Sequence, residues 1–267
     1  MIDESTDETM TTSSDQIAGK VPRDAAAWQG PSNVALVLIV ALLVVAGTFA
    51  LLAVRHHDQQ DGTSSIRPSG IPASVSTPVA DLMALSPVPN RPAPAFTLTD
   101  QNSRRLSLSS FKGRAVVIEF MDPHCTDICP LVSKEFVDAY HDLGSAASRV
   151  VFLAVNVNQY YASTGDMAAY SREYQLNTIP SWHFFTGSVP SLKAAWRDYG
   201  IEVDAPNPKA DIIHTSVVFF IDPGGKERYI ATPMDDHTKA GTAYLPANQL
   251  ASWGRGIALI TKHLIQQ

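Results

Sequence analysis

An uncharged apolar run from Val34 to Val54 is the feature that most limits how this chain can fold. The run has 21 positions, contains no charge and no proline, and has Thr48 as its one strongly polar residue. At about 1.5 Å of rise per residue, a helix of this length crosses a hydrocarbon core of roughly 30 Å. The alternative is a cleaved secretory signal, but its apolar region usually has about 7 to 15 residues after a short basic leader. We therefore expect one uncleaved transmembrane helix at residues 34–54.

The segments on either side of this run have compositions that disfavour a packed core. Residues 1–33 are rich in Ser, Thr and acidic residues, which predicts a disordered tail. Residues 55–94 are rich in Pro and Ser, and because proline fixes φ and lacks a backbone donor, they favour extended structure. We expect a linker there that holds one domain, residues 95–267, away from the membrane.

Basic residues exclude one class of partner but do not decide the topology. In residues 95–267, Lys and Arg nearly balance Asp and Glu and form no stripe, which argues against a nucleic-acid partner. Beside the apolar run, Lys20 and Arg23 precede it while Arg55 and Arg67 follow it. Because the positive charge is equal on both sides, it does not orient the helix in the membrane.

The hydrophobic pattern of the domain predicts strands and helices in the order of an α/β layer fold. Near-continuous apolar runs at residues 115–121 and 149–157 predict central strands that are covered on both faces. Other segments predict hairpins at 96–111 and 215–230, a short strand at 181–187, and helices at 129–144, 165–175, 191–200 and 247–265. This order predicts a thioredoxin-like fold with a mixed central sheet flanked by helices.

The two cysteines of the chain, Cys125 and Cys129, come directly after the first central strand. The carboxyl end of such a strand is a usual place for chemistry. A thiol near a helix N-terminus has a lowered pKa, because the dipole and the free N–H groups stabilise its thiolate. Residues i and i+4 of a helix lie roughly 5 to 6 Å apart at Cβ, so both sulfurs could bind one metal ion. A disulfide stays possible if the first turn is irregular.

A metal site needs a third ligand, and His214 is the candidate because it stands just before a predicted strand. Two thiolates and one imidazole suit copper, as Cu(I) or Cu(II). Structural zinc usually takes four ligands, which the sequence does not offer at fitting spacings.

The remaining histidines and Asp127 have ordinary interpretations. His124, beside Cys125, is a candidate ligand or an exposed loop residue, and His183 is a packing residue in an apolar strand. Asp127, between the cysteines, is expected to cap the helix rather than to contact a partner. The others are expected at the membrane interface or on the surface: His56, His57, His141, His237 and His263.

The segments "FTLTDQNSRRLSLSSFKGRAVVIEF", "CTDICP" and "HTSVVFFIDPGG" together resemble the Sco/SenC family. The resemblance, over about residues 92–230, implies a membrane-anchored, thioredoxin-like copper protein that helps assemble the dinuclear copper site of cytochrome c oxidase. It implies that Cys125, Cys129 and His214 are copper ligands, and Asp127 and Pro130 match the rest of the motif. It also implies a single-pass protein of the cell membrane with its C-terminal domain on the extracytoplasmic side.

The sequence departs from the family pattern at several positions, and this leaves the partner open. Thr126 replaces the usual Pro after the first cysteine, and Ile213 replaces the usual Asp before the ligand histidine. We expect copper delivery to cytochrome c oxidase subunit II or to another extracytoplasmic copper protein. The alternative is a thiol-disulfide oxidoreductase that acts on extracytoplasmic client cysteines, so whether the chain is an enzyme stays open. The cysteine pair disfavours peroxide reduction, which uses a lone cysteine of low pKa. A purely structural disulfide is also disfavoured, because so short a loop gains little from closure.

Overall fold

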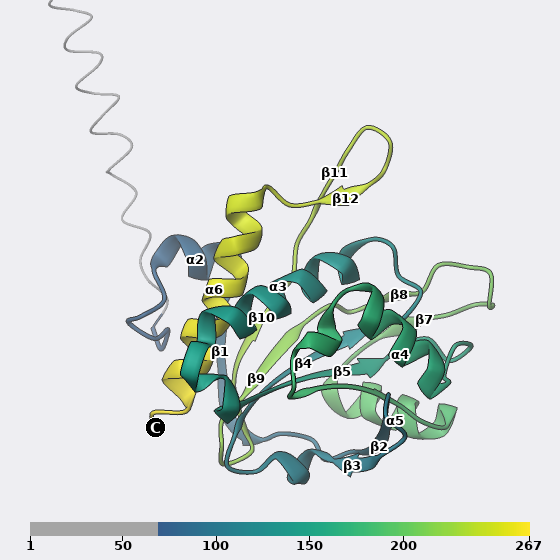
Figure 1. Cartoon of the computed structure of the whole chain (residues 1–267), viewed down its shortest axis with the longest axis horizontal. Coiled ribbons are helices and arrows are strands. Elements are labelled where there is room, and N and C mark those ends of the chain that lie inside the picture. Colours follow the sequence, from purple (N-terminus) through teal and green to yellow (C-terminus); the bar gives the residue numbers. More distant parts are fainter. Residues whose placement is uncertain (1–68) are drawn as a thin grey trace, which may run out of the picture. The chain divides into compact units, whose positions relative to one another are not determined.

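One mixed sheet of eight strands organises the structure, a computed structural model that describes residues 69–267 (Figure 1). The strands are β1 Ser86–Pro92, β2 Thr97–Asp100, β3 Arg105–Ser107, β4 Ala115–Met121, β5 Val150–Asn156, β6 Trp182–Thr186, β9 Val218–Ile221 and β10 Lys226–Ala231. Their order across the sheet is β1-β10-β9-β4-β5-β6-β2-β3. β5 pairs in parallel with both β4 and β6, and the other pairs are antiparallel. The expected mixed central sheet is confirmed.

Helices cover both faces of this sheet. They are α2 Thr77–Leu82, α3 Ile128–Leu143, α4 Thr164–Glu173, α5 Val189–Tyr199 and α6 Ala247–Leu264. Helices α2, α3, α4 and α6 contribute to one hydrophobic core, and α5 contributes to the core on the opposite face. Each helix expected within residues 95–267 is present. Gly200 ends α5 with a φ of 71°, as a C-terminal glycine often does.

Strand β4 lies at the centre because both of its faces are apolar. Val116, Ile118 and Phe120 pack in the core with α5, whereas Val117 and Met121 pack in the core with α3 and α6. Successive side chains of a strand point to opposite faces, so this run fills both cores. Burying each large apolar side chain stabilises the fold by about 1.5 to 3 kcal/mol. The loop after β4 is therefore held on a rigid support.

Two small antiparallel ribbons accompany the main sheet. β7 Val203–Asp204 pairs with β8 Ile213–His214, and β11 Asp236–His237 pairs with β12 Ala243–Tyr244. The sequence did not predict either ribbon, because two-residue strands carry too few residues to show alternation. Both lie in loops that the hydrophobic pattern leaves unassigned, and both reach the candidate site described below.

The expected boundary between linker and domain at residue 95 is too late. Helix α2 and strand β1 lie within the expected linker, and the side chains of Val75, Met83 and Leu85 are buried in the core shared with α3 and α6. β1 pairs with β10 at the edge of the sheet, where the missing N–H groups of its prolines are tolerated. The folded unit therefore includes the second half of the proline-rich segment.

Three of the expected segments lie outside the described residues: the tail 1–33, the transmembrane helix 34–54 and the linker residues 55–68. Within residues 69–267, none of the helices is both long and apolar enough to cross a membrane.

Candidate metal centre

The loop between β4 and α3 carries the cysteine pair and is organised by Asp122. The Oδ1 atom of Asp122 accepts hydrogen bonds from the backbone N–H of His124 at 2.8 Å and from Asn158 Nδ2 at 2.9 Å. Its carbonyl oxygen accepts the N–H of Cys125 at 3.1 Å. Asp122 is buried at the end of β4, so these bonds tie the loop to the sheet. Cys125 thus has a fixed position just before α3.

Cys129 lies in the first turn of α3, on the face that packs against the core. Cys129, Val132 and Phe136 have helical spacing and are all buried in the same core. Cys129 is 2% exposed, whereas Cys125 is half-buried, and both are free thiols. One sulfur therefore faces the surface and the other lies behind it.

The pair is electrostatically asymmetric. The pKa of Cys125 is lowered to about 7, first because the Cys129 thiol donates a hydrogen bond to it, and then because the N–H groups of Cys129 and Asp127 do so; burial opposes this. The pKa of Cys129 is raised well above its ordinary value by the same hydrogen bond, by burial and by the charge of Cys125. Cys125 is therefore the thiol that ionises near neutral pH, and Cys129 keeps its proton. The sequence alone did not show which of the two cysteines has the lower pKa.

This asymmetry predicts the effect of Cys129→Ala on Cys125. The substitution removes the hydrogen bond that lowers the pKa of Cys125 most, so we expect that pKa to rise from about 7 toward the ordinary 9.0. The measurement is the rate of iodoacetamide alkylation against pH, under anaerobic, metal-free conditions. The Cys125→Ala chain reports the reactivity of Cys129 alone. Equal midpoints in the wild type and in Cys129→Ala would contradict the assignment.

His214 offers one ring nitrogen to the same region. Its Nδ1 lies 3.0 Å from the carbonyl oxygen of Thr215, and since a carbonyl only accepts, Nδ1 carries the proton. Burial lowers the pKa of His214, although the Thr215 carbonyl and the charge of Asp122 oppose this. A neutral ring with Nδ1 protonated leaves a lone pair on Nε2, which is the form that binds metals.

A pocket of about 580 Å³ brings the predicted residues together. Cys125 and His214 both line it, along with Asp122, His124 and Asp127. Cys129 lies behind Cys125 and is hydrogen-bonded to it. The three ligand atoms are not all within 4.8 Å of one another; in residues 69–267 that closeness is reached by the group Asp127, Asp235 and His237. The fold therefore places Cys125 and His214 at one pocket with Cys129 behind Cys125, and the three ligand atoms do not converge on one point.

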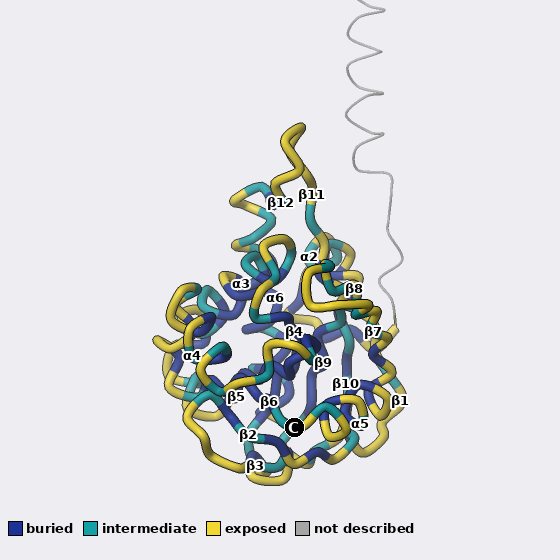
Figure 2. Tube along the Cα trace, turned by 90° about the vertical axis from the view of Figure 1, so that its right-hand side faces the viewer, coloured by how far each residue is buried: buried dark blue, intermediate teal, exposed yellow. Residues whose placement is uncertain are grey.

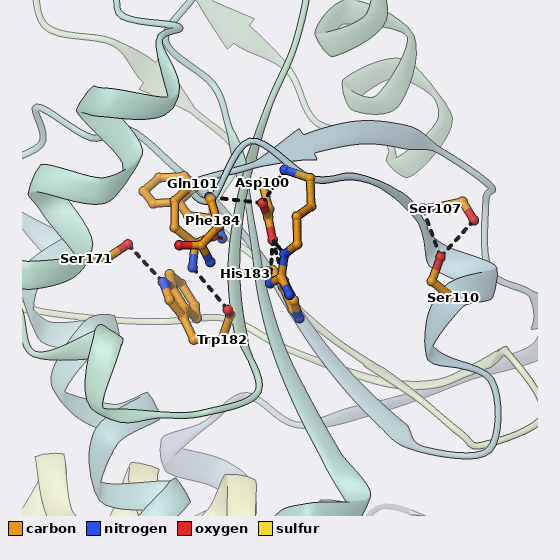
Figure 3. A network of polar contacts seen from close by, with 10 residues as sticks. Asp100, Gln101, Ser107, Ser110, Ser171, Trp182, His183 and Phe184 are labelled. Atoms are coloured by element: carbon orange, nitrogen blue, oxygen red, sulfur yellow. Dashed lines mark hydrogen bonds and ion pairs between the residues drawn. The ribbon is translucent and has the colours of Figure 1, made fainter.

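The other sequence expectations have mixed outcomes. His124 is exposed and lines the pocket, and its ring lies against that of Tyr161 with centroids 3.8 Å apart and an interplanar angle of 32°. His183 is a packing residue as expected: its Nδ1 lies 3.0 Å from Asp100, which also binds Arg104 (Figure 3). The expected cap at Asp127 is wrong, because its side chain makes no capping bond and instead contacts His237.

Sequence reasoning missed a buried carboxylate behind the cysteines. Glu119, in β4, points toward the core that holds Cys129, and it is 1% exposed. Burial raises the pKa of Glu119 to about 8, although Ser216 donates a 2.9 Å hydrogen bond to it. Its charge also raises the pKa of Cys129. A charged residue in the middle of the apolar run "AVVIEFM" was the signal that could have identified it.

Comparison with known proteins gives one family. The model of the family SCO1/SenC matches residues 87–243. The SCO1 protein homolog of Bacillus subtilis (strain 168) is 25% identical over 133 residues, which are 49% of this chain and 68% of that protein. The solved structure of ScoI from Bradyrhizobium japonicum with copper bound has a TM-score of 0.50 at 20% identity, and the match covers 65% of this chain and 99% of that one. Together with the sheet order, this likeness confirms the expected thioredoxin-like fold.

Over a shorter segment, the chain is also similar to a different group of proteins. Chloroplastic peroxiredoxin Q of Oryza sativa subsp. japonica is 36% identical over 83 residues, which are 31% of this chain and 34% of that protein. The chain thus matches about a third of that relative.

Proposed function

Because this chain belongs to the SCO1/SenC family, we propose that it binds copper at Cys125, Cys129 and His214 and delivers it to an extracytoplasmic acceptor. The acceptor we propose is cytochrome c oxidase subunit II, at its dinuclear copper site. We also propose that residues 34–54 anchor the chain in the cell membrane as a single helix, with the domain on the extracytoplasmic side. The related ScoI structure has copper bound, which supports this choice of metal.

The observation that carries the proposal is the shared pocket. Cys125 and His214 come from segments almost ninety positions apart and line the same cavity, with Cys129 directly behind Cys125. Thiolates favour Cu(I), and an imidazole makes Cu(II) acceptable as well. Two sulfurs and one nitrogen are therefore a suitable donor set for copper in either state.

The three proposed ligands differ in whether they must lose a proton before they bind copper. Cys125 ionises near neutral pH because its pKa is lowered to about 7, and His214 presents the free lone pair of Nε2. Cys129 must lose its proton, so copper uptake is expected to release protons and to weaken as the pH falls. The three ligand atoms must also move closer together than they lie in this structure.

The open pocket also suits transfer. With three protein ligands and a cavity of about 580 Å³ beside Cys125, a ligand from an acceptor has room to approach the ion. Exchange then proceeds by replacing one protein ligand at a time, and the copper keeps its coordination throughout. A closed four-ligand site would resist this exchange.

Thiol-disulfide exchange is the second candidate, and the asymmetric pair favours it specifically. The Cys125 thiolate would attack a client disulfide and form a mixed disulfide, while the leaving client sulfur takes up a proton. Cys129 would then lose its proton, attack Cys125 Sγ and release the second client thiol. The client is reduced, and the pair ends as a Cys125–Cys129 disulfide. In this reaction His214 has no direct part.

His214 therefore separates the two functions. In an anaerobic titration of the reduced full-length chain with Cu(I) against a competing chelator, we expect one tight equivalent. His214→Ala should weaken it by about 10- to 100-fold or more, since even residues that only support ligands have effects of that size. His141→Ala, on the exposed side of α3, is the control. If His214→Ala leaves the Cu(I) affinity unchanged, and if both cysteines are needed for disulfide reduction, thiol exchange is the better assignment.

A further inference from the structure

Two carboxylates and one imidazole, side chains of the kinds that can bind metal ions, lie together beside the cysteine loop. Asp127 is between the two cysteines, and Asp235 and His237 belong to the hairpin of β11 and β12, which is largely exposed (Figure 2). His237 Nε2 lies 2.9 Å from Asp127 Oδ1 and 3.5 Å from Asp235 Oδ2. One ligand atom from each residue lies within 4.8 Å of the others. The proposed copper ligands do not include any of these residues.

We propose that Asp127, Asp235 and His237 form a second site, which binds a divalent first-row metal ion such as Zn²⁺. Its three ligands are distinct from the proposed copper ligands, and Asp127 also lines the pocket that Cys125 and His214 share. The metal would link the cysteine loop to the β11–β12 hairpin.

The spacing of the three side chains fits an ion of this size. Nitrogen and oxygen ligands lie about 2.0 to 2.2 Å from Zn²⁺, so two ligand atoms of a tetrahedral site are about 3.4 Å apart. The distances from His237 Nε2 to the two carboxylates are 2.9 and 3.5 Å. The third pair, one carboxylate oxygen each of Asp127 and Asp235, lies within 4.8 Å. Shifts on the order of 1 Å would therefore complete a three-ligand site whose remaining position takes water.

The local backbone explains why the hairpin supplies two of the three ligands. Asp235 directly precedes β11, and His237 ends it, two positions further on. Side chains two positions apart in extended backbone share a face, so both turn toward Asp127. Their partner strand, β12, holds this register through the pairs of Asp236 with Tyr244 and of His237 with Ala243.

The charges also favour a cation. The carboxylates of Asp127 and Asp235 both approach the imidazole of His237, at 2.9 and 3.5 Å, so two negative charges lie close together. One divalent ion would offset both negative charges. The donor atoms also indicate which kind of metal ion would bind. Carboxylate oxygens disfavour Cu(I), and an imidazole disfavours Mg²⁺ and Ca²⁺. Zn²⁺ accepts both kinds of ligand.

The test is calorimetric titration with Zn²⁺ of the full-length chain carrying Cys125→Ser and Cys129→Ser, which removes the thiolates as competing ligands. We expect one equivalent of Zn²⁺ at neutral pH. Adding His237→Ala or Asp235→Asn should weaken binding at least about 10-fold. Adding His141→Ala, which removes a different exposed histidine, should leave Zn²⁺ binding unchanged. Excess Ca²⁺ should not displace the Zn²⁺.

Thermal unfolding in the wild-type background, with both cysteines present, is the second measurement. Zn²⁺ should raise the unfolding temperature less in His237→Ala than in the wild type, because one stabilising site is lost. The proposal is overturned if Zn²⁺ affinity is the same with and without His237, or if Ca²⁺ competes equally well. Neither result would alter the Cu(I) affinity that tests the proposed function.

Discussion

Cys125→Ala is expected to weaken Cu(I) binding by at least about 100-fold, the largest effect on binding that we predict from a single substitution. Changes in residues that only support metal ligands already cost about 10- to 100-fold, so losing a ligand should cost more. The loss should be greater for Cys125 than for Cys129, because Cys125 lines the pocket and has the lower pKa of the two thiols. The measurement is competition for Cu(I) with a chelator of known affinity, under anaerobic conditions.

The matched variants make this result specific. Cys129→Ala should also weaken binding, and in addition it should change how binding depends on pH, since Cys129 is the thiol that must give up a proton. His141→Ala should leave the affinity unchanged. If Cys125→Ala binds Cu(I) as tightly as the wild type, the pocket is not a copper site, and the reduction potential of the cysteine pair becomes the informative quantity.

Glu119→Gln is expected to cause a large change in how the stability of the folded chain depends on pH. Burial raises the pKa of Glu119 from 4.5 to about 8. Between these values the folded chain holds a proton that the unfolded chain has released, so the contribution of Glu119 to stability falls as the pH rises. At about 1.4 kcal/mol per pKa unit, the fall across this window is on the order of 5 kcal/mol.

Glutamine does not titrate, and its Oε1 can still accept the hydrogen bond from Ser216 Oγ. The free energy of unfolding of Glu119→Gln relative to the wild type should therefore increase steadily from about pH 4.5 to 8 and level off above that range. Urea denaturation at a series of pH values measures this difference. Asp142→Asn, which removes an exposed carboxylate of α3, is the control for loss of charge alone. Parallel pH curves for Glu119→Gln and the wild type would show that Glu119 does not hold its proton.

Much of the site could be predicted because it is built from local sequence signals. The apolar run of β4, the cysteines that follow it and the helical spacing of Cys129 with Val132 and Phe136 are consecutive in the chain. A strand buried on both faces and a helix with one apolar face each need only neighbouring residues to be recognised. The place of His214 just before a strand came from the same kind of reasoning, and the shared pocket agrees with it.

The N-terminal boundary was misplaced because local composition and tertiary context disagree there. Prolines argue against a strand when residues 86–92 are taken alone. In the folded chain these residues pair with β10 at the edge of the sheet, and α2 packs against α6. Which residues form an edge strand depends on the order of the whole sheet, which no single segment contains.

The sequence alone identified the central strands and the longer helices of the domain, the cysteine pair with its distant histidine, and the family. The packed fold was needed to show that Cys125 has a lower pKa than Cys129, that burial raises the pKa of Glu119, and that Asp127 contacts His237 instead of capping α3. Hydrophobic periodicity records which face of an element is buried, and neighbouring residues suffice to show it. The pKa of a side chain depends instead on desolvation and on partners that the fold brings from distant positions, and these exist only once the elements are packed.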